Sequence, residues 1–107
     1  MSWTVEILNE TVTAELVALP DDVQARFQWI VHLIEVRGLE QVHRPYIGHL
    51  DGPIWEIRMK GRDGIARALY VTAKGQRVVV VRVFVKKTQK TPPAEIRLAK
   101  KRAGEIT

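Results

Sequence analysis

The sequence predicts one domain of the α+β class, in the order β-α-α-β-β-β-α, with a small antiparallel sheet that helices cover on one face. Three observations support this prediction. Apolar residues recur at helical spacing in the N-terminal third, three strand-like segments follow with glycine-containing turns between them, and a Thr-Pro pair begins a basic C-terminal segment. A length of 107 residues fits a single domain over residues 1–107.

The first elements are a short strand and two helices. Residues 3–8 alternate enough to form a strand, and Asn9 or Thr11 is suited to cap a first helix that ends near Leu19. Pro20 suits the first turn of a second helix. Because the connection is short, we expect the two helices to lie in antiparallel contact.

An apolar stripe predicts the buried face of the second helix, and Gly38 is placed to end that helix. Residues at this spacing lie on one side of a helix, so the stripe is expected to pack against the sheet. Its members are Val23, Phe27, Ile30, Val31 and Ile34.

The middle of the chain predicts a loop and then three strands. Glycines and prolines punctuate residues 39–53, which are expected to be loop. Turns at residues 60–64 and 74–76 separate the strands. The strands are expected at residues 54–59, 65–72 and 78–85. The last of them is almost continuously β-branched, which is typical of a buried strand.

The C-terminal part is basic. Thr91 and Pro92 begin a last helix that Gly104 ends. Its outer side is expected to carry Arg97, Lys100, Lys101 and Arg102. The net charge is +5, yet residues 1–40 hold seven acids and two bases, whereas residues 41–107 hold five acids and fifteen bases. This imbalance predicts a polyanionic partner, either a nucleic acid or an acidic protein.

Several classes of protein are excluded or disfavoured. The chain has no cysteine, so disulfides, thiolate catalysis and cysteine metal sites are absent. Its three histidines lack metal-ligand spacing, so we expect no metal and no cofactor. No apolar run is long enough to span a membrane, and the N-terminus does not have the pattern of a signal peptide. We therefore expect a cytoplasmic protein with no membrane partner.

Strand alternation assigns the two faces of the sheet. The inward set is Trp55, Ile57, Met59, Ala66, Ala68, Tyr70, Val79, Val81, Val83 and Val85. The outward set is Glu56, Arg58, Arg67, Arg82, Phe84 and Lys86, with Lys87 and Lys90 just beyond its rim. Arginines bind phosphates and an aromatic ring stacks on a base, so this outer face suits RNA. The alternative is an ordinary solvated strand face.

Three stretches resemble a known family. They are Ile54-Trp55-Glu56-Ile57-Arg58, Arg67-Ala68-Leu69-Tyr70, and the Phe-x-Lys-Lys-x-x-Lys-x-Pro segment from Phe84 to Pro92, followed by Glu95-Ile96 and Ala99. Together they resemble the HigB-like, phage-derived branch of the RelE/ParE toxins of type II toxin-antitoxin systems. The resemblance implies a metal-independent endoribonuclease that cuts mRNA on the ribosome and is held silent by a cognate antitoxin protein.

The resemblance also implies site residues. Glu56 and Arg58 match an outward polar pair, Arg67 matches a phosphate-binding arginine, and Lys87 falls near a basic residue that approaches the leaving oxygen. The tyrosine or histidine that several relatives place near the C-terminus is missing, so the general acid and base are not identified. We therefore expect Arg67, Arg58, Lys87 and Glu56 to be catalytic, and Arg82, Phe84, Lys86 and Lys90 to bind RNA.

Some roles stay open. Lys86, Lys87 or Lys90 is expected to stabilise the leaving oxygen, and Glu56 is either a base or the ion-pair partner of an arginine. His43 and His49 are either proton-transfer groups at the edge of the site or exposed side chains. Trp3 and Trp55 are expected in the core, and Trp29 and His32 are expected to be structural.

Two other functions remain as alternatives. One is a ParE-like inhibitor of DNA gyrase with the same fold. The other is a non-catalytic nucleic-acid-binding phage accessory protein. An antitoxin would cover either the basic face or a groove beside the helices.

Overall fold

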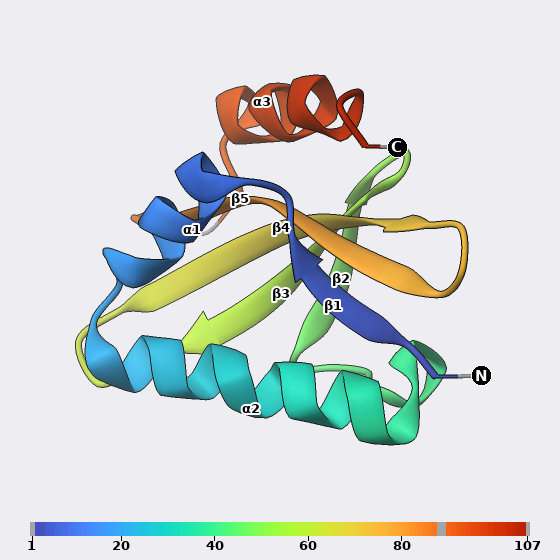
Figure 1. Cartoon of the computed structure of the whole chain (residues 1–107). Coiled ribbons are helices and arrows are strands. Elements are labelled where there is room, and N and C mark those ends of the chain that lie inside the picture. Colours follow the sequence, from blue (N-terminus) through green and yellow to red (C-terminus); the bar gives the residue numbers. More distant parts are fainter. Residues whose placement is uncertain (1, 88–89, 107) are drawn as a thin grey trace.

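Within residues 2–87 and 90–106, which the computed structural model describes, the chain forms five strands, three α-helices and one 3₁₀ helix (Figure 1). The predicted α+β class is confirmed. The elements are β1 (Thr4–Ile7), α1 (Glu10–Val17), α2 (Asp21–Arg37), η1 (Leu39–Gln41), β2 (Ile47–Asp51), β3 (Ile54–Lys60), β4 (Ile65–Ala73), β5 (Arg77–Lys86) and α3 (Pro93–Ala103).

The strands form one mixed sheet in the order β1-β5-β4-β3-β2. β2 to β5 pair antiparallel, and β1 pairs parallel with β5 at the other edge. The expectation that residues 39–53 are loop was wrong for β2, which pairs with β3. Gly48 and the Gly52-Pro53 turn hid this strand, because glycine and proline lower the strand signal of a short segment.

Helices cover both faces of the sheet, whereas one covered face was expected. α2 lies below the sheet and α3 above it in Figure 1. The core on the α1 and α2 face includes Val12, Phe27, Ile30, Ile57 and Tyr70. The second core, beneath α3, includes Ile54, Leu69, Val71, Val79, Val81, Phe84 and Ala99. The polar outer face is therefore confined to the part of the sheet that α3 leaves uncovered.

A β-bulge in β5 changes which valines share a face. Tyr70 pairs with Val80 while Leu69 pairs with Arg82, so Val81 is an extra residue in the ladder. Consequently Val79 and Val81 pack beneath α3, whereas Val83 packs in the core of the α1 and α2 face. The prediction of one inward face from Val79 to Val85 was wrong, because strict alternation fails at a bulge. Val85 itself is half exposed.

The helix ends follow the sequence signals. The Asn9 side chain accepts a hydrogen bond from Val12 N–H at 3.0 Å, and Gly38 ends α2 at a φ of 88°. The sheet, rather than the other helix, is the main packing partner of each of the first two helices. α1 packs mainly on β5, while α2 packs on β3 and β1.

Two tryptophans lie at the surface. Trp55, which was expected in the core, is 40% exposed because it lies near the edge strand β2, and Trp29 on α2 is 43% exposed. Among the described residues, no helix is long and apolar enough to cross a membrane.

Candidate functional site

Three rows of paired residues cross β3, β4 and β5. Residues that pair directly project from the same face of a sheet, so each row places its side chains together. The rows are Glu56–Leu69–Arg82, Arg58–Arg67–Phe84 and Lys60–Ile65–Lys86. The predicted outer face is therefore assembled as expected, with Glu56 beside the arginines of the middle row.

Glu56 is the centre of this face and is only 3% exposed. Its Oε2 accepts a hydrogen bond from Arg58 Nε at 2.9 Å, and its Oε1 lies 3.2 Å from Arg67 Nε. The Thr91 hydroxyl also donates to Oε1 at 3.0 Å. Of the two roles left open for Glu56, the observed contacts are those of an ion-pair partner that holds both arginines.

Arg67 is buried at 8% exposure. Its Nη1 donates to the carbonyl of Ala66 at 3.1 Å. The Nε–H is close to Glu56 but is not directed at the oxygen well enough to form a hydrogen bond, so that contact is mainly electrostatic. Burial lowers the pKa of the Arg67 guanidinium, the nearby Arg58 adds to this effect, and Glu56 opposes it. Arginine nevertheless stays charged at neutral pH, so Arg67 presents a fixed, poorly solvated cation.

Arg58 is positioned by a glycine that sequence reasoning did not identify. Its guanidinium lies across Gly48 of β2, where an added Cβ would come within 2.8 Å of Arg58 Cζ and still closer to Nη2. Glycine in a strand interior often marks such a close approach. The only sequence signal was therefore a glycine inside a segment that was expected to be loop.

These residues line a hollow that we name the Glu56 hollow. Its volume is about 430 Å³. Its polar wall consists of Glu56, Arg58, Arg67, Lys86, Lys90 and Thr91, and Leu50 and Ile96 complete it. Four of the six polar groups are cationic, so the hollow suits an anion such as a phosphate.

Lys86 is half-buried in the wall of this hollow. Burial lowers the pKa of its ammonium group, the charges of Arg67 and Arg58 lower it further, and Glu56 opposes them. A lysine with a lowered pKa gives up its proton more readily than an exposed lysine. Lys86 is thus the lysine of the hollow whose pKa is lowered.

Arg82 and Phe84 lie on the same face but have structural partners. Arg82 pairs with Glu15 of α1 at 2.9 Å and with Glu95 of α3 at 2.7 Å, and its hydrogen bond to Glu95 is the main cause of its raised pKa. Phe84 is 9% exposed in the core beneath α3. Arg102, expected on the outer side of α3, instead pairs with Glu15 at 2.9 Å.

Other predicted residues lie away from the Glu56 hollow. Lys87 is exposed and is not among the described residues that line it. His49 Nε2 lies 2.8 Å from the carbonyl of Gly52, and its ring contacts Trp55 at a centroid distance of 4.9 Å. His43 lines a different depression, beside Trp55. Neither histidine therefore lies at the edge of the site.

Thr88 and Gln89 of the Phe-x-Lys-Lys segment lie outside the described residues. In the described ranges, no three histidine or acidic side chains are grouped so that they would hold a metal ion. The described polar lining of the Glu56 hollow consists of four cations, one carboxylate and one hydroxyl.

Comparison with known proteins identifies the family. Residues 14–104 match the model described as "Phage derived protein Gp49-like (DUF891)". The fold is similar to the crystal structure of the archaeal RelE–RelB complex from Pyrococcus horikoshii OT3, with a TM-score of 0.56, 21% identity, and coverage of 79% of this chain and 96% of that one. No match is found among curated proteins. The chain belongs to the phage-derived Gp49-like family and has a RelE-like fold, as the sequence resemblance implied.

Proposed function

We propose that the protein is the toxin of a type II toxin-antitoxin system and acts in the cytoplasm as a metal-independent endoribonuclease on ribosome-bound mRNA. The observation that carries this proposal is the Glu56 hollow, where Arg58 and Arg67 are held by one buried carboxylate beside Lys86 and Lys90. Family membership and the RelE-like fold support the same function.

The reaction we propose is attack by a ribose 2′-hydroxyl on the adjacent phosphate. The 2′-hydroxyl gives up its proton to solvent water as its oxygen bonds to phosphorus and forms a cyclic 2′,3′-phosphate. The bond from phosphorus to the 5′-oxygen breaks, and this oxygen takes a proton from the protein and leaves as a hydroxyl. Arg67 and Arg58 stabilise the charge that develops on the phosphate oxygens, where preorganised cations contribute most. Glu56 is a positioning residue for both arginines, Arg58 and Arg67.

A lysine supplies the proton to the leaving 5′-oxygen in this scheme. Lys86 is favoured by geometry, because it lines the Glu56 hollow and its pKa is lowered. Lys87 was assigned from the resemblance and occupies the adjacent, exposed position. Lys90 borders the same hollow and is assigned to RNA binding.

A cognate antitoxin is the second proposed partner. The archaeal relative was crystallised as a RelE–RelB complex. We place an acidic antitoxin segment over the cationic rim of the Glu56 hollow, where it would exclude RNA.

The test combines intact ribosomes, a defined mRNA and the purified protein, which has either been stripped of metal with EDTA and dialysed or been left untreated. We expect equal cleavage by the two protein samples, new 5′-hydroxyl ends, and loss of cleavage in Arg67→Ala. Arg62→Ala is the matched control, because Arg62 is 88% exposed in the β3–β4 turn. Inhibition of gyrase supercoiling without RNA cleavage would overturn the proposal.

A non-catalytic RNA-binding protein is the second candidate. It is favoured by the two ion pairs of Glu56 and by the absence of histidine among the described residues that line the hollow. This candidate predicts RNA binding that depends on Arg67, with no cut ends at any protein concentration.

A further inference from the structure

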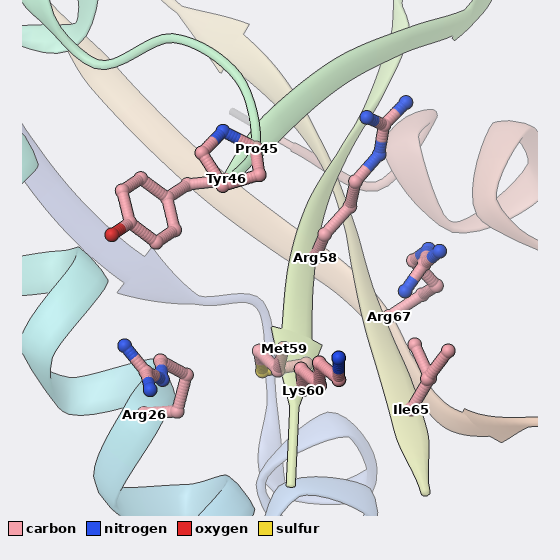
Figure 2. A pocket seen from close by; sticks show the side chains of 8 residues that line it. All are labelled: Arg26, Pro45, Tyr46, Arg58, Met59, Lys60, Ile65 and Arg67. Carbon is pink, nitrogen blue, oxygen red and sulfur yellow. The ribbon is translucent and has the colours of Figure 1, made fainter.

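A second hollow adjoins the Glu56 hollow and shares Arg58 and Arg67 with it; we name it the Tyr46 hollow (Figure 2). Its volume is about 370 Å³, within the range of about 300–1,000 Å³ that ligand sites occupy. Figure 2 shows Arg58 and Arg67 on one side, with Tyr46 and Arg26 across from them. The nucleic-acid function proposed above does not use this second hollow.

The Tyr46 hollow is cationic. Four of its lining residues are basic, namely Arg26, Arg58, Lys60 and Arg67, and its described lining includes no acid. Over the described part of the chain, neither Arg26 nor Lys60 has a carboxylate partner. Arg58 and Arg67 share the single carboxylate of Glu56, so the four cations together exceed their counterions and repel one another, which favours a bound polyanion.

Tyr46 provides an aromatic wall that is held in place. The carbonyl of Tyr46 accepts a hydrogen bond from Arg58 N–H at 2.8 Å, which fixes its backbone. Its ring meets Trp29 of α2 edge to face, at a centroid distance of 5.3 Å and an angle of 74°. The Arg26 guanidinium lies 5.6 Å from the same tryptophan ring, so Trp29 positions both an aromatic ring and a cation.

A site for a single-stranded nucleotide requires an aromatic ring, an apolar surface and surrounding cations. Bases stack on aromatic side chains, and phosphates bind arginine and lysine. Ile65, which is 41% exposed, supplies the apolar surface. An acidic peptide would match the charge but would leave the aromatic wall without a flat partner.

We propose that the Tyr46 hollow binds the ribonucleotide next to the phosphate held in the Glu56 hollow, with its base on Tyr46 and its flanking phosphate on Arg26 and Lys60. The inference rests on the proposed function, since the two hollows share Arg58 and Arg67. It adds a specificity-determining subsite that lies between α2 and the sheet.

The test measures binding of a fluorescent tetraribonucleotide that is 2′-O-methylated at every position, so that it cannot be cleaved. We expect Tyr46→Leu to weaken binding roughly 5- to 150-fold, the loss that corresponds to one stacked base. Tyr46→Phe keeps the ring and is expected to bind like the unaltered protein. Arg26→Gln, at an exposed position, is expected to weaken binding and to make its dependence on salt shallower.

The outcomes separate this inference from the proposed function. If Tyr46→Leu and Arg26→Gln bind normally while Arg67→Ala does not, the subsite is wrong and the proposed function stands. If the tetranucleotide binds through Tyr46 and mRNA is never cut, the subsite stands and the proposed nuclease activity fails. If the unaltered protein binds no oligonucleotide but its Tyr46 hollow binds an acidic peptide, the subsite is also overturned.

Discussion

The guanidinium of Arg58 lies against Gly48 of the neighbouring strand, in space that any side chain at position 48 would occupy. Arg58 in turn donates to Glu56, and Glu56 contacts Arg67. A glycine on an edge strand therefore sets the position of a cation in the middle of the sheet face.

Gly48→Ala is expected to move the Arg58 side chain out of the Glu56 hollow. Because only the flexible Arg58 side chain must shift, the free energy of unfolding should fall by just about 1 kcal/mol. RNA binding and cleavage should be strongly reduced, because they depend on the position of Arg58. Gly64→Ala is the matched control, since a Cβ at that position meets nothing within 4 Å. Urea unfolding and the ribosome assay measure the two effects, and equal behaviour of the two variants would contradict the role of Gly48.

Lys86 is expected to titrate below the ordinary lysine pKa of 10.5. Its protonated form should therefore be lost earlier as the pH rises, and if Lys86 is the proton donor, cleavage should decline over the same alkaline range. Removing the positive charge in Arg58→Gln should raise the pKa of Lys86, because Arg58 is one of the charges that lower it. NMR titration of the lysine Cε signals measures the pKa of Lys86 directly, and the signal that disappears in Lys86→Gln is the one that belongs to Lys86. A pKa of Lys86 at the ordinary lysine value would contradict the prediction.

Arg82 is expected to stabilise the fold rather than to bind RNA. It joins α1 to α3 through Glu15 and Glu95, and the side chains in these pairs are between 15% and 23% exposed. Arg82→Ala should lower the free energy of unfolding by about 2 kcal/mol, since it removes the arginine partner of Glu95 and one of the two arginines that pair with Glu15, in a partly solvated setting. The salt dependence of oligonucleotide binding should stay unchanged. A shallower salt dependence in this variant would restore Arg82 to the RNA-binding set.

Periodic segments were predictable from the sequence. The stripe from Val23 to Ile34 placed the buried face of α2, and alternation on β3 and β4 brought Glu56, Arg58 and Arg67 together. Both results follow from local geometry, because helical spacing and strand alternation determine which side chains share a face.

The remaining features depend on contacts between distant segments. The run of valines from Val78 to Val81 carries no polar marker, so the bulge that turns Val81 toward α3 left no sequence signal. Thr91 reaches Glu56 only because α3 folds over the sheet, and Tyr46 approaches Arg26 only because both contact Trp29. Such pairs are far apart in the chain, which is why the sequence predicted the arginines of the site but not their positioning partners.

Tyr70 should make the fold sensitive to high pH. It is 1% exposed on β4, and burial raises the pKa of its phenol well above the ordinary value of 10.0. Above pH 10 the unfolded chain therefore loses the Tyr70 proton while the folded chain keeps it, so the folded state binds more protons and stability falls as pH rises. The slope contributed by this one group is about 1.4 kcal/mol per pH unit. Tyr70→Phe should remove that slope in urea unfolding between pH 9 and 11. Tyr46→Phe changes a less buried ring and is the control that should retain the slope. Equal slopes in the unaltered protein and both variants would show that Tyr70 ionises in the folded state as easily as in the unfolded chain.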